Sequence, residues 1–116
     1  MKRVIAFLIA LAIPVGLYAL NASVNVTTTA AKLMTPGPLV KTIVIQNPAG
    51  STGTINVSLD GTQPTSTTGI AITSGTQLVL NYTGAPSGSV HVVNAIAVTG
   101  NTTINVSTDD TQSTAP

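Results

Sequence analysis

The sequence lacks most of the side chains on which catalysis and ligand recognition usually depend. It has no Cys, no Trp, no Glu and a single His, and charged residues make up only 6% of its 116 residues, whereas roughly 25% is ordinary for a soluble domain. The absence of Cys excludes disulfides, thiolate metal sites and cysteine catalysis. Scarce Lys and Arg argue against a nucleic-acid partner, because such binding depends on neutralising phosphates.

The few residues that could carry chemistry are poorly placed for it. His91 stands between valines in a strand-like run, and no nucleophile-elbow sequence accompanies it. Asp60, Asp109 and Asp110 are the only carboxylates, whereas a calcium site generally needs about six to eight oxygen ligands. Aromatic residues make up 3% of the chain, too few for a stacking platform. We therefore predict no enzyme activity and no catalytic, cofactor-binding or metal-binding residues.

An uncharged apolar run occupies residues 4–20, directly after Lys2 and Arg3. Its 17 residues exceed the core of a usual signal peptide, about 7–15 residues, and fall at the lower limit of about 17 for a membrane-spanning helix. A basic flank suits both roles. Residues 1–21 are thus predicted to form an apolar helix that is either a cleaved signal or a retained membrane anchor.

Beyond this run the chain reads as short β-favourable segments separated by Gly, Pro, Asn and Ser. The predicted strands are 22–28, 39–46, 54–59, 70–72, 77–82, 90–98 and 103–108. This pattern predicts an all-β fold, an antiparallel sandwich or jelly-roll-like domain of about seven strands preceded by the apolar N-terminal helix. We divide the rest of the chain into an extended arm and linker at 22–38, a β-sandwich domain at 39–108, and a polar tail at 109–116 that is expected to fray.

One seven-residue pattern, Thr-Ile-Asn-Val-Ser-x-Asp, occurs twice, at residues 54–60 and 103–109. Its strict alternation predicts strands with one buried and one outward face. Pairing 39–46 with 54–59, and 90–98 with 103–108, would give two similar hairpins. An internal duplication is one explanation of the likeness, and chance similarity between Thr- and Val-rich strands is the other.

Hydroxyl and amide side chains replace the missing charge, with 20 Thr, 9 Ser and 8 Asn. Six of the eight Asn residues begin an Asn-x-Ser/Thr sequon, the acceptor of N-glycosylation. The possible glycosylation sites are Asn21, Asn25, Asn56, Asn81, Asn101 and Asn105. The alternation of Asn, an apolar residue and Thr in strands could also raise this number without any attached sugar.

Several short motifs resemble those of small β-sandwich virion proteins. They are Lys-Thr-Ile-Val-Ile-Gln-Asn from residue 41, Gly-Ile-Ala-Ile from residue 69, Gln-Leu-Val-Leu from residue 77 and Val-Asn-Ala-Ile-Ala-Val-Thr-Gly from residue 93. The family comprises decoration, head-fibre and minor capsid modules of phages and related prokaryotic viruses. The resemblance covers about residues 37–108 and implies assembly contacts without catalytic residues. The apolar N-terminal segment departs from the family pattern and would suit a virus with an internal membrane.

Two functions follow from these observations. The first is a structural assembly protein, a minor capsid, decoration or spike component of a prokaryotic virus, with residues 4–20 in a membrane or between subunits. The alternative is an exported, glycosylated subunit of an archaeal or bacterial cell-surface filament, in which residues 22–29 complete a neighbour's sheet by strand donation. A soluble binding or carbohydrate-active module is a third, weaker reading. The expected partners are copies of the chain or other structural subunits, without nucleic acid or cofactors, and the expected location is a virion or the cell surface.

Overall fold

The computed structural model describes residues 20–51, 53–84, 90–110 and 112–116, and these residues form eight β-strands. The strands are β1 (Leu20–Val26), β2 (Ala31–Met34), β3 (Thr42–Asn47), β4 (Ile55–Ser58), β5 (Ile70–Ile72), β6 (Thr76–Asn81), β7 (Val93–Ala97) and β8 (Thr102–Thr108). The predicted N-terminal helix lies outside the described residues except for its last two positions. Those two, Leu20 and Asn21, belong to β1.

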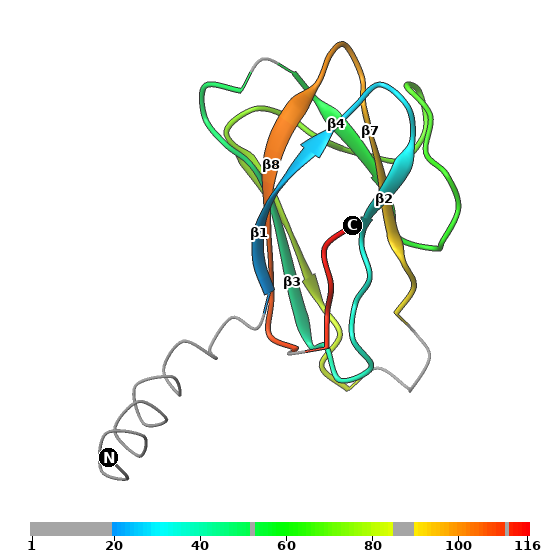
Figure 1. Cartoon of the computed structure of the whole chain (residues 1–116), viewed down its shortest axis with the longest axis vertical. Coiled ribbons are helices and arrows are strands. Elements are labelled where there is room, and N and C mark those ends of the chain that lie inside the picture. The colour runs from blue at the N-terminus through cyan, green and yellow to red at the C-terminus, as the bar shows by residue number, and fades with distance from the viewer. Residues whose placement is uncertain (1–19, 52, 85–89, 111) are drawn as a thin grey trace, which may run out of the picture.

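The strands form two four-stranded antiparallel sheets. Sheet A has the order β1-β8-β3-β6, and sheet B has the order β2-β7-β4-β5. Figure 1 shows β1, β8 and β3 on one side of the molecule and β2 and β7 on the other. Apart from β4 and β5, every two consecutive strands lie in opposite sheets, which is the crossing pattern of a jelly roll. The prediction of an all-β antiparallel fold is confirmed, with eight strands where about seven were expected.

The two predicted hairpins are wrong. β3 pairs with β6 and β8, and β4 pairs with β5 and β7, so β3 and β4 do not pair. β7 and β8 likewise lie in opposite sheets. The two repeated segments are therefore central strands of different sheets. Alternation along a strand indicates which face is buried, but it carries no information about which strand lies beside it.

Residues 22–38 are not an arm outside the sandwich. β1 pairs with β8 at seven consecutive positions, so its residues are an edge strand of their own domain rather than a free donor. β2 pairs with β7, with a register shift between Lys32 and Met34. Pro36, Gly37 and Pro38 follow β2 closely. Because Pro is rare inside sheets, this cluster led the sequence analysis to assign a linker where a strand of four residues lies. The strand predicted at 90–98 covers only Val93–Ala97.

The core lies between the sheets and consists of aliphatic side chains together with Met34. Its fully buried side chains include Ile43, Ile45, Ile104 and Val106 from sheet A, and Ile55, Val57 and Val93 from sheet B. Full burial of such a side chain contributes roughly 1.5–3 kcal/mol. In β3, Ile43 and Ile45 point inward, whereas Val44 lies on the outer face and is half-buried.

The residues after β8 pack against the segment that leads into β3. Asp110 and Ser113 are buried, and Ser113 Oγ accepts a hydrogen bond of 2.8 Å from the Gly37 N–H. Thr35 and Thr114 exchange two backbone hydrogen bonds of 2.8 and 2.9 Å. The described part of the polar tail is therefore attached to the domain and does not fray. In Figure 1 the C-terminus lies beside β2.

The described residues contain no helix at all, so none is present there that could span a membrane. Residues 4–19 of the apolar run, on which the signal or anchor prediction rests, lie outside them.

Candidate assembly surface

The outer face of sheet A carries no charged side chain. We call "the sheet A face" the outward residues of its four strands, which are Asn21, Ser23, Asn25, Thr42, Val44, Gln46, Gln77, Val79, Asn81, Thr103, Asn105 and Ser107. The strand pairing aligns them in rows, one of which runs from Ser23 through Asn105 and Gln46 to Gln77. The surface is thus a regular array of amides and hydroxyls with two valines.

Two sequons pair reciprocally on this face. Ser23 Oγ donates a hydrogen bond of 2.9 Å to Asn105 Oδ1, and Ser107 Oγ donates one of 3.2 Å to Asn21 Oδ1. Ser23 belongs to the sequon of Asn21, and Ser107 belongs to that of Asn105. Each serine therefore bonds the asparagine of the opposite sequon, because β1 and β8 are antiparallel neighbours.

The six predicted glycosylation sites are not equivalent in the structure. Asn21, Asn25, Asn81 and Asn101 are exposed, and Asn105 is half-buried. Asn56 is only 6% exposed, and its Nδ2 donates a hydrogen bond of 3.0 Å to Thr65 O. Since a glycan would be attached at this nitrogen, we expect Asn56 to be a poor acceptor once the chain has folded. Four of the remaining Asn residues lie on the sheet A face, and Asn101 lies in the loop before β8.

Loop 59–69 explains why Asn56 in the first repeated segment is buried, whereas Asn105 in the second is only half-buried. Residues 59–69 fold back over the outer face of sheet B, where Asn94 Nδ2 donates hydrogen bonds to Thr62 O at 2.9 Å and to Gly61 O at 3.1 Å. Gly69 permits this close approach with φ +111°, since a Cβ there would lie 2.9 Å from Val57 O. The loop thus covers the outer face of sheet B around Asn56 and Asn94, and the sheet A face has no comparable cover within the described chain.

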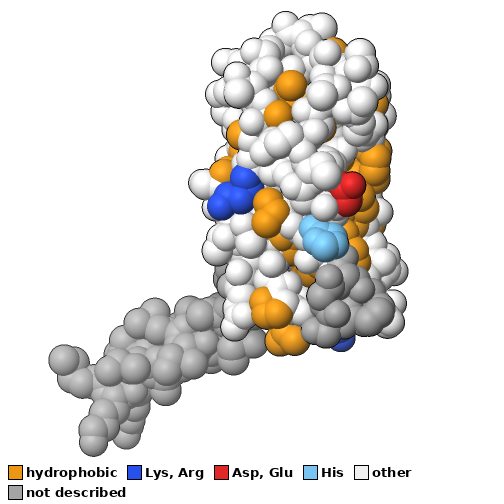
Figure 2. All heavy atoms as spheres, turned by 90° about the vertical axis from the view of Figure 1, so that its right-hand side faces the viewer, with side chains coloured by type: hydrophobic (Ala, Val, Ile, Leu, Met, Phe, Trp, Pro, Cys, Tyr) orange, Lys and Arg blue, Asp and Glu red, His pale blue; other side chains and the backbone are white. Residues whose placement is uncertain are grey.

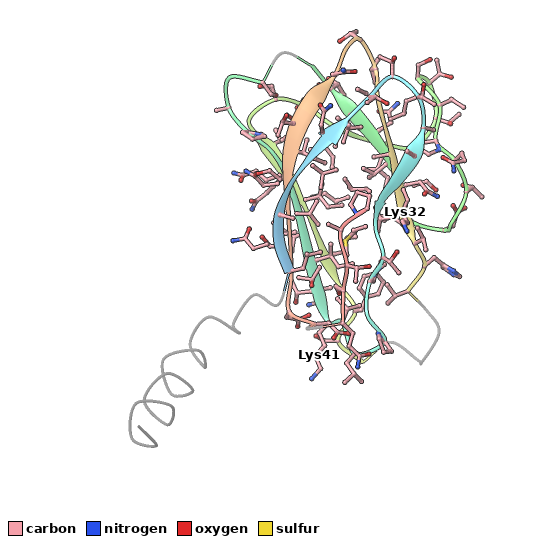
Figure 3. The ribbon with its side chains drawn as sticks, viewed as in Figure 1. Lys32 and Lys41 are labelled. Atoms are coloured by element: carbon pink, nitrogen blue, oxygen red, sulfur yellow. The ribbon has the colours of Figure 1, made fainter. Side chains whose placement is uncertain are left out.

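The edges of sheet B are protected against pairing with other chains. β5 is three residues long, and β2 is four residues long, contains Lys32 and has an irregular register. Short strands, bulges and edge lysines are the devices by which proteins prevent edge-to-edge association. The described residues contain two lysines, and Figure 3 shows them apart, Lys32 on β2 and Lys41 at the end of the sandwich where the chain enters β3.

The edges of sheet A have none of these devices. β1 is seven residues long and β6 is six, and neither contains a charged residue or Pro. Each keeps an uninterrupted register with its neighbour in the sheet. The Tyr82 N–H donates to Lys41 O at 2.6 Å. Donors alternate along an antiparallel edge strand, so the N–H groups of Gln77, Val79 and Asn81 point to the open side. Among the described residues, β6 thus presents an unpaired row of backbone donors and acceptors on its open side.

Apolar surface accompanies both open flanks of the sandwich. On the β5/β6 flank, Ile70 is 42% and Val79 53% exposed. On the β1/β2 flank, a groove of about 170 Å³ is lined by residues that include Val24, Val26 and Leu33. The sequence reasoning did not identify either feature. Val79 carried a weak signal, because it is an apolar residue on the otherwise polar side of an alternating strand.

The titratable residues do not form a reactive cluster. Asp60 and His91 line a shallow hollow of about 440 Å³ beside loop 59–69. Hydrogen bonds from Thr62 and Ser58 hold the pKa of Asp60 well below its usual range. Among the described residues no three His, Asp or Glu side chains gather where a metal could bind. Figure 2 shows the charged side chains of one face standing singly among uncharged ones.

The two remaining carboxylates bind backbone. Asp109 Oδ1 accepts hydrogen bonds from the Lys41 and Thr42 N–H groups at 2.9 and 3.2 Å. Asp110 accepts from the Leu39 N–H through Oδ2 at 2.7 Å and from the Gln112 N–H through Oδ1 at 2.9 Å. Both residues therefore bind the end of β8 to the segment that leads into β3, and their role is to stabilise the fold.

No protein-family model and no curated protein matches the chain. One similar solved structure comes from Bacillus endospore appendages, described as forming a novel family of disulfide-linked pili. It shares 12% sequence identity over 83% of each chain, with a TM-score of 0.40. A likeness at this level carries no argument about the role of the present chain, which in addition has no Cys.

Proposed function

We propose that the protein is a structural subunit that assembles with copies of itself into an extracellular filament. One observation carries this proposal: sheet A has two long, uncharged, regular edge strands, whereas both edges of sheet B are short or blunted. Exposed edges of this kind promote association between chains. A fold that protects one sheet and leaves the other bare is suited to association through the bare one.

The composition supports the same role. Charged residues keep soluble proteins apart, and this chain has few of them, with none on the sheet A face. Lys2, Arg3 and the apolar run 4–20 support export. β1 already occupies the edge of its own sheet, so the association we propose joins folded subunits and does not require donation of residues 22–29.

The test compares two matched charge variants of the full chain. Gln77→Lys/Val79→Lys places two lysines on the edge strand β6. Gln46→Lys/Val44→Lys places the same charges on their direct cross-strand partners in the central strand β3. Filaments are detected by sedimentation and electron microscopy. We expect the edge variant to raise the concentration needed for assembly at least about tenfold, which corresponds to roughly 1.4 kcal/mol, and the central variant to change it little.

Two results would contradict the filament proposal. The unmodified chain could remain monomeric at high concentration, or the edge and central variants could assemble equally well. Circular dichroism and thermal unfolding of each variant show that a loss of assembly reflects the interface and not the fold.

A virion component is the second candidate, and the strand order favours it, because the double-sheet jelly roll is a common architecture of viral capsid domains. In that case the chain should assemble only with a partner shell. Immunogold labelling of host cultures separates the two candidates: label on viral particles supports the virion role, and label on cell-attached fibres supports the filament.

A further inference from the structure

We propose that the filament contact is head-to-tail, with β6 of one copy pairing antiparallel with β1 of the next, so that sheet A continues from subunit to subunit. This inference rests on the proposed function and specifies its interface. It names a second copy of this chain as the occupant of each open edge of sheet A.

Strand direction supports this pairing. Every neighbour in sheet A is antiparallel and the sheet has four strands, so the two edge strands β1 and β6 run in opposite directions. A copy moved sideways along the sheet therefore brings its β1 antiparallel to the β6 of the first copy. The outer face stays on the same side in this movement, so polar side chains continue to meet polar ones. The natural twist of the sheet would turn successive copies and give a helical array.

The two edges also match in length and chemistry. β1 has seven residues and β6 has six, without charge, Pro or Gly in either. The outward N–H groups of Gln77, Val79 and Asn81 require acceptors, and a neighbouring β1 supplies a backbone carbonyl row. Such strand addition gives affinity through main-chain hydrogen bonds.

In this arrangement sheet B adds an apolar contact between the β5 edge of one copy and the β2 edge of the next. Ile70, Val57, Ala95 and Ala31 lie in one row across sheet B. Ala31 and Ala95 line the groove on the β1/β2 flank, while Ile70 is exposed at the opposite end of the row. Sideways repetition brings Ile70 of one copy toward the groove of the next.

A two-fold contact would have a different consequence. Pairing β6 with β6 closes a dimer and leaves both β1 edges unused, whereas pairing β6 with β1 is heterologous and can extend without limit. An extended assembly with one kind of contact thus requires the second arrangement.

Cysteine cross-linking tests the pairing, because the chain contains no native Cys that could form a competing disulfide. Val79→Cys is mixed with Asn21→Cys, Ser23→Cys or Asn25→Cys, the three outward positions of β1, and oxidised under assembling conditions. Opposed residues of a hydrogen-bonded antiparallel pair have Cα atoms about 5.5 Å apart, which lies within the range of about 4.4–6.8 Å that a disulfide spans. We expect at least one mixture to give heterodimers about tenfold above either single variant alone, and the matching double variant to give a ladder of larger oligomers.

The outcomes separate the interface from the function. Efficient homodimers of Val79→Cys alone, or assembly that persists while all three mixtures fail to cross-link, would overturn the head-to-tail pairing and leave the filament proposal standing. Failure of the unmodified chain to sediment would overturn both. A second variant, Val79→Pro, removes one outward N–H without removing a ladder bond to β3. We expect it to fold and to lose assembly, and normal assembly of this variant would contradict the pairing.

Discussion

Ser23 donates a hydrogen bond to Asn105 across β1 and β8, over a separation of 82 residues in the chain. Together with the reciprocal bond from Ser107 to Asn21, it ties two glycosylation sequons to each other. The two bonds fix the side chains of Asn21 and Asn105, whose amide oxygens both accept a hydrogen bond from the neighbouring strand.

Glycan mapping should distinguish the six sequons. We expect that in a host with N-glycosylation Asn56 carries no sugar, because it is buried and its Nδ2 is hydrogen-bonded. Occupied sites should come from Asn21, Asn25, Asn81, Asn101 and Asn105. Intact-mass measurement followed by peptide mapping gives the occupancy of each site. A folded chain with a glycan on Asn56 would contradict the described position of loop 59–69.

Replacing Asp110 by Asn should destabilise the fold by about 1–3 kcal/mol, since a partly buried backbone N–H would lose a hydrogen bond to a charged acceptor. Both carboxylate oxygens of Asp110 are used, one by the Leu39 N–H and the other by the Gln112 N–H. An amide offers only one oxygen, so one of these donors would face an NH₂ group. The change in free energy of unfolding is measured by urea denaturation.

Asp109→Asn is the matched control for that substitution. Asp109 accepts both of its backbone hydrogen bonds through Oδ1, so the amide oxygen of Asn can keep them. Its loss should stay below about 1 kcal/mol. Equal losses for the two variants would show that the bonds to Asp110 do not have the importance we assign to them.

Acid should loosen loop 59–69 through Asp60. The pKa of this carboxyl is lowered in the folded chain by hydrogen bonds from Thr62 and Ser58, whereas an unfolded Asp titrates near about 3.9. A lowered folded pKa stabilises the fold above the unfolded value, and this contribution is lost as the pH falls from about 4 through the folded pKa. Urea midpoints between about pH 5 and about pH 2 should fall less steeply for Asp60→Asn than for the unmodified chain. Parallel curves would contradict the expectation.

The N-terminal boundary of the folded unit can be tested by truncation. A chain that starts at Leu20 keeps all of β1 and should unfold cooperatively. A chain that starts at Thr27 loses seven cross-strand positions and the buried Val26, whose burial alone contributes about 1.5–3 kcal/mol. Thermal unfolding of the two chains measures the difference. Equal midpoints would mean that β1 is dispensable for the domain.

The sequence predicted which face of a strand is buried better than it predicted which strands pair with each other. Alternation identified the strands around Ile55 and Ile104 and gave each of them one buried face, because side-chain direction is a local property of a strand. It could not assign partners, since β3 pairs only with β6 and β8, which are distant in the chain, and β4 pairs with the distant β7 as well as with β5. β2 was missed because four residues give too short a period and a Pro-Gly-Pro cluster follows closely.

The candidate surface was predictable only in part. The lack of charge and the sequons were evident from composition, yet the burial of Asn56 depends on the path of loop 59–69, which looked like an ordinary polar loop. Which strands form the edges depends on topology, so the contrast between β6 and β5 became visible only in the fold. Only the position of Val79 on the edge strand β6 relates its exposed apolar side chain to the proposed contact between subunits.

The location of Pro116 has a practical consequence. This residue lines the groove between β1 and β2 together with Val24 and Leu33. Any affinity tag, fluorescent protein or further polypeptide joined after Pro116 would emerge from the domain beside the β1 edge. There it would hinder addition of the next subunit to the proposed filament. An epitope inserted near Ser66, in the exposed part of loop 59–69, would leave both edges of sheet A accessible and is the better choice for following the protein in cells.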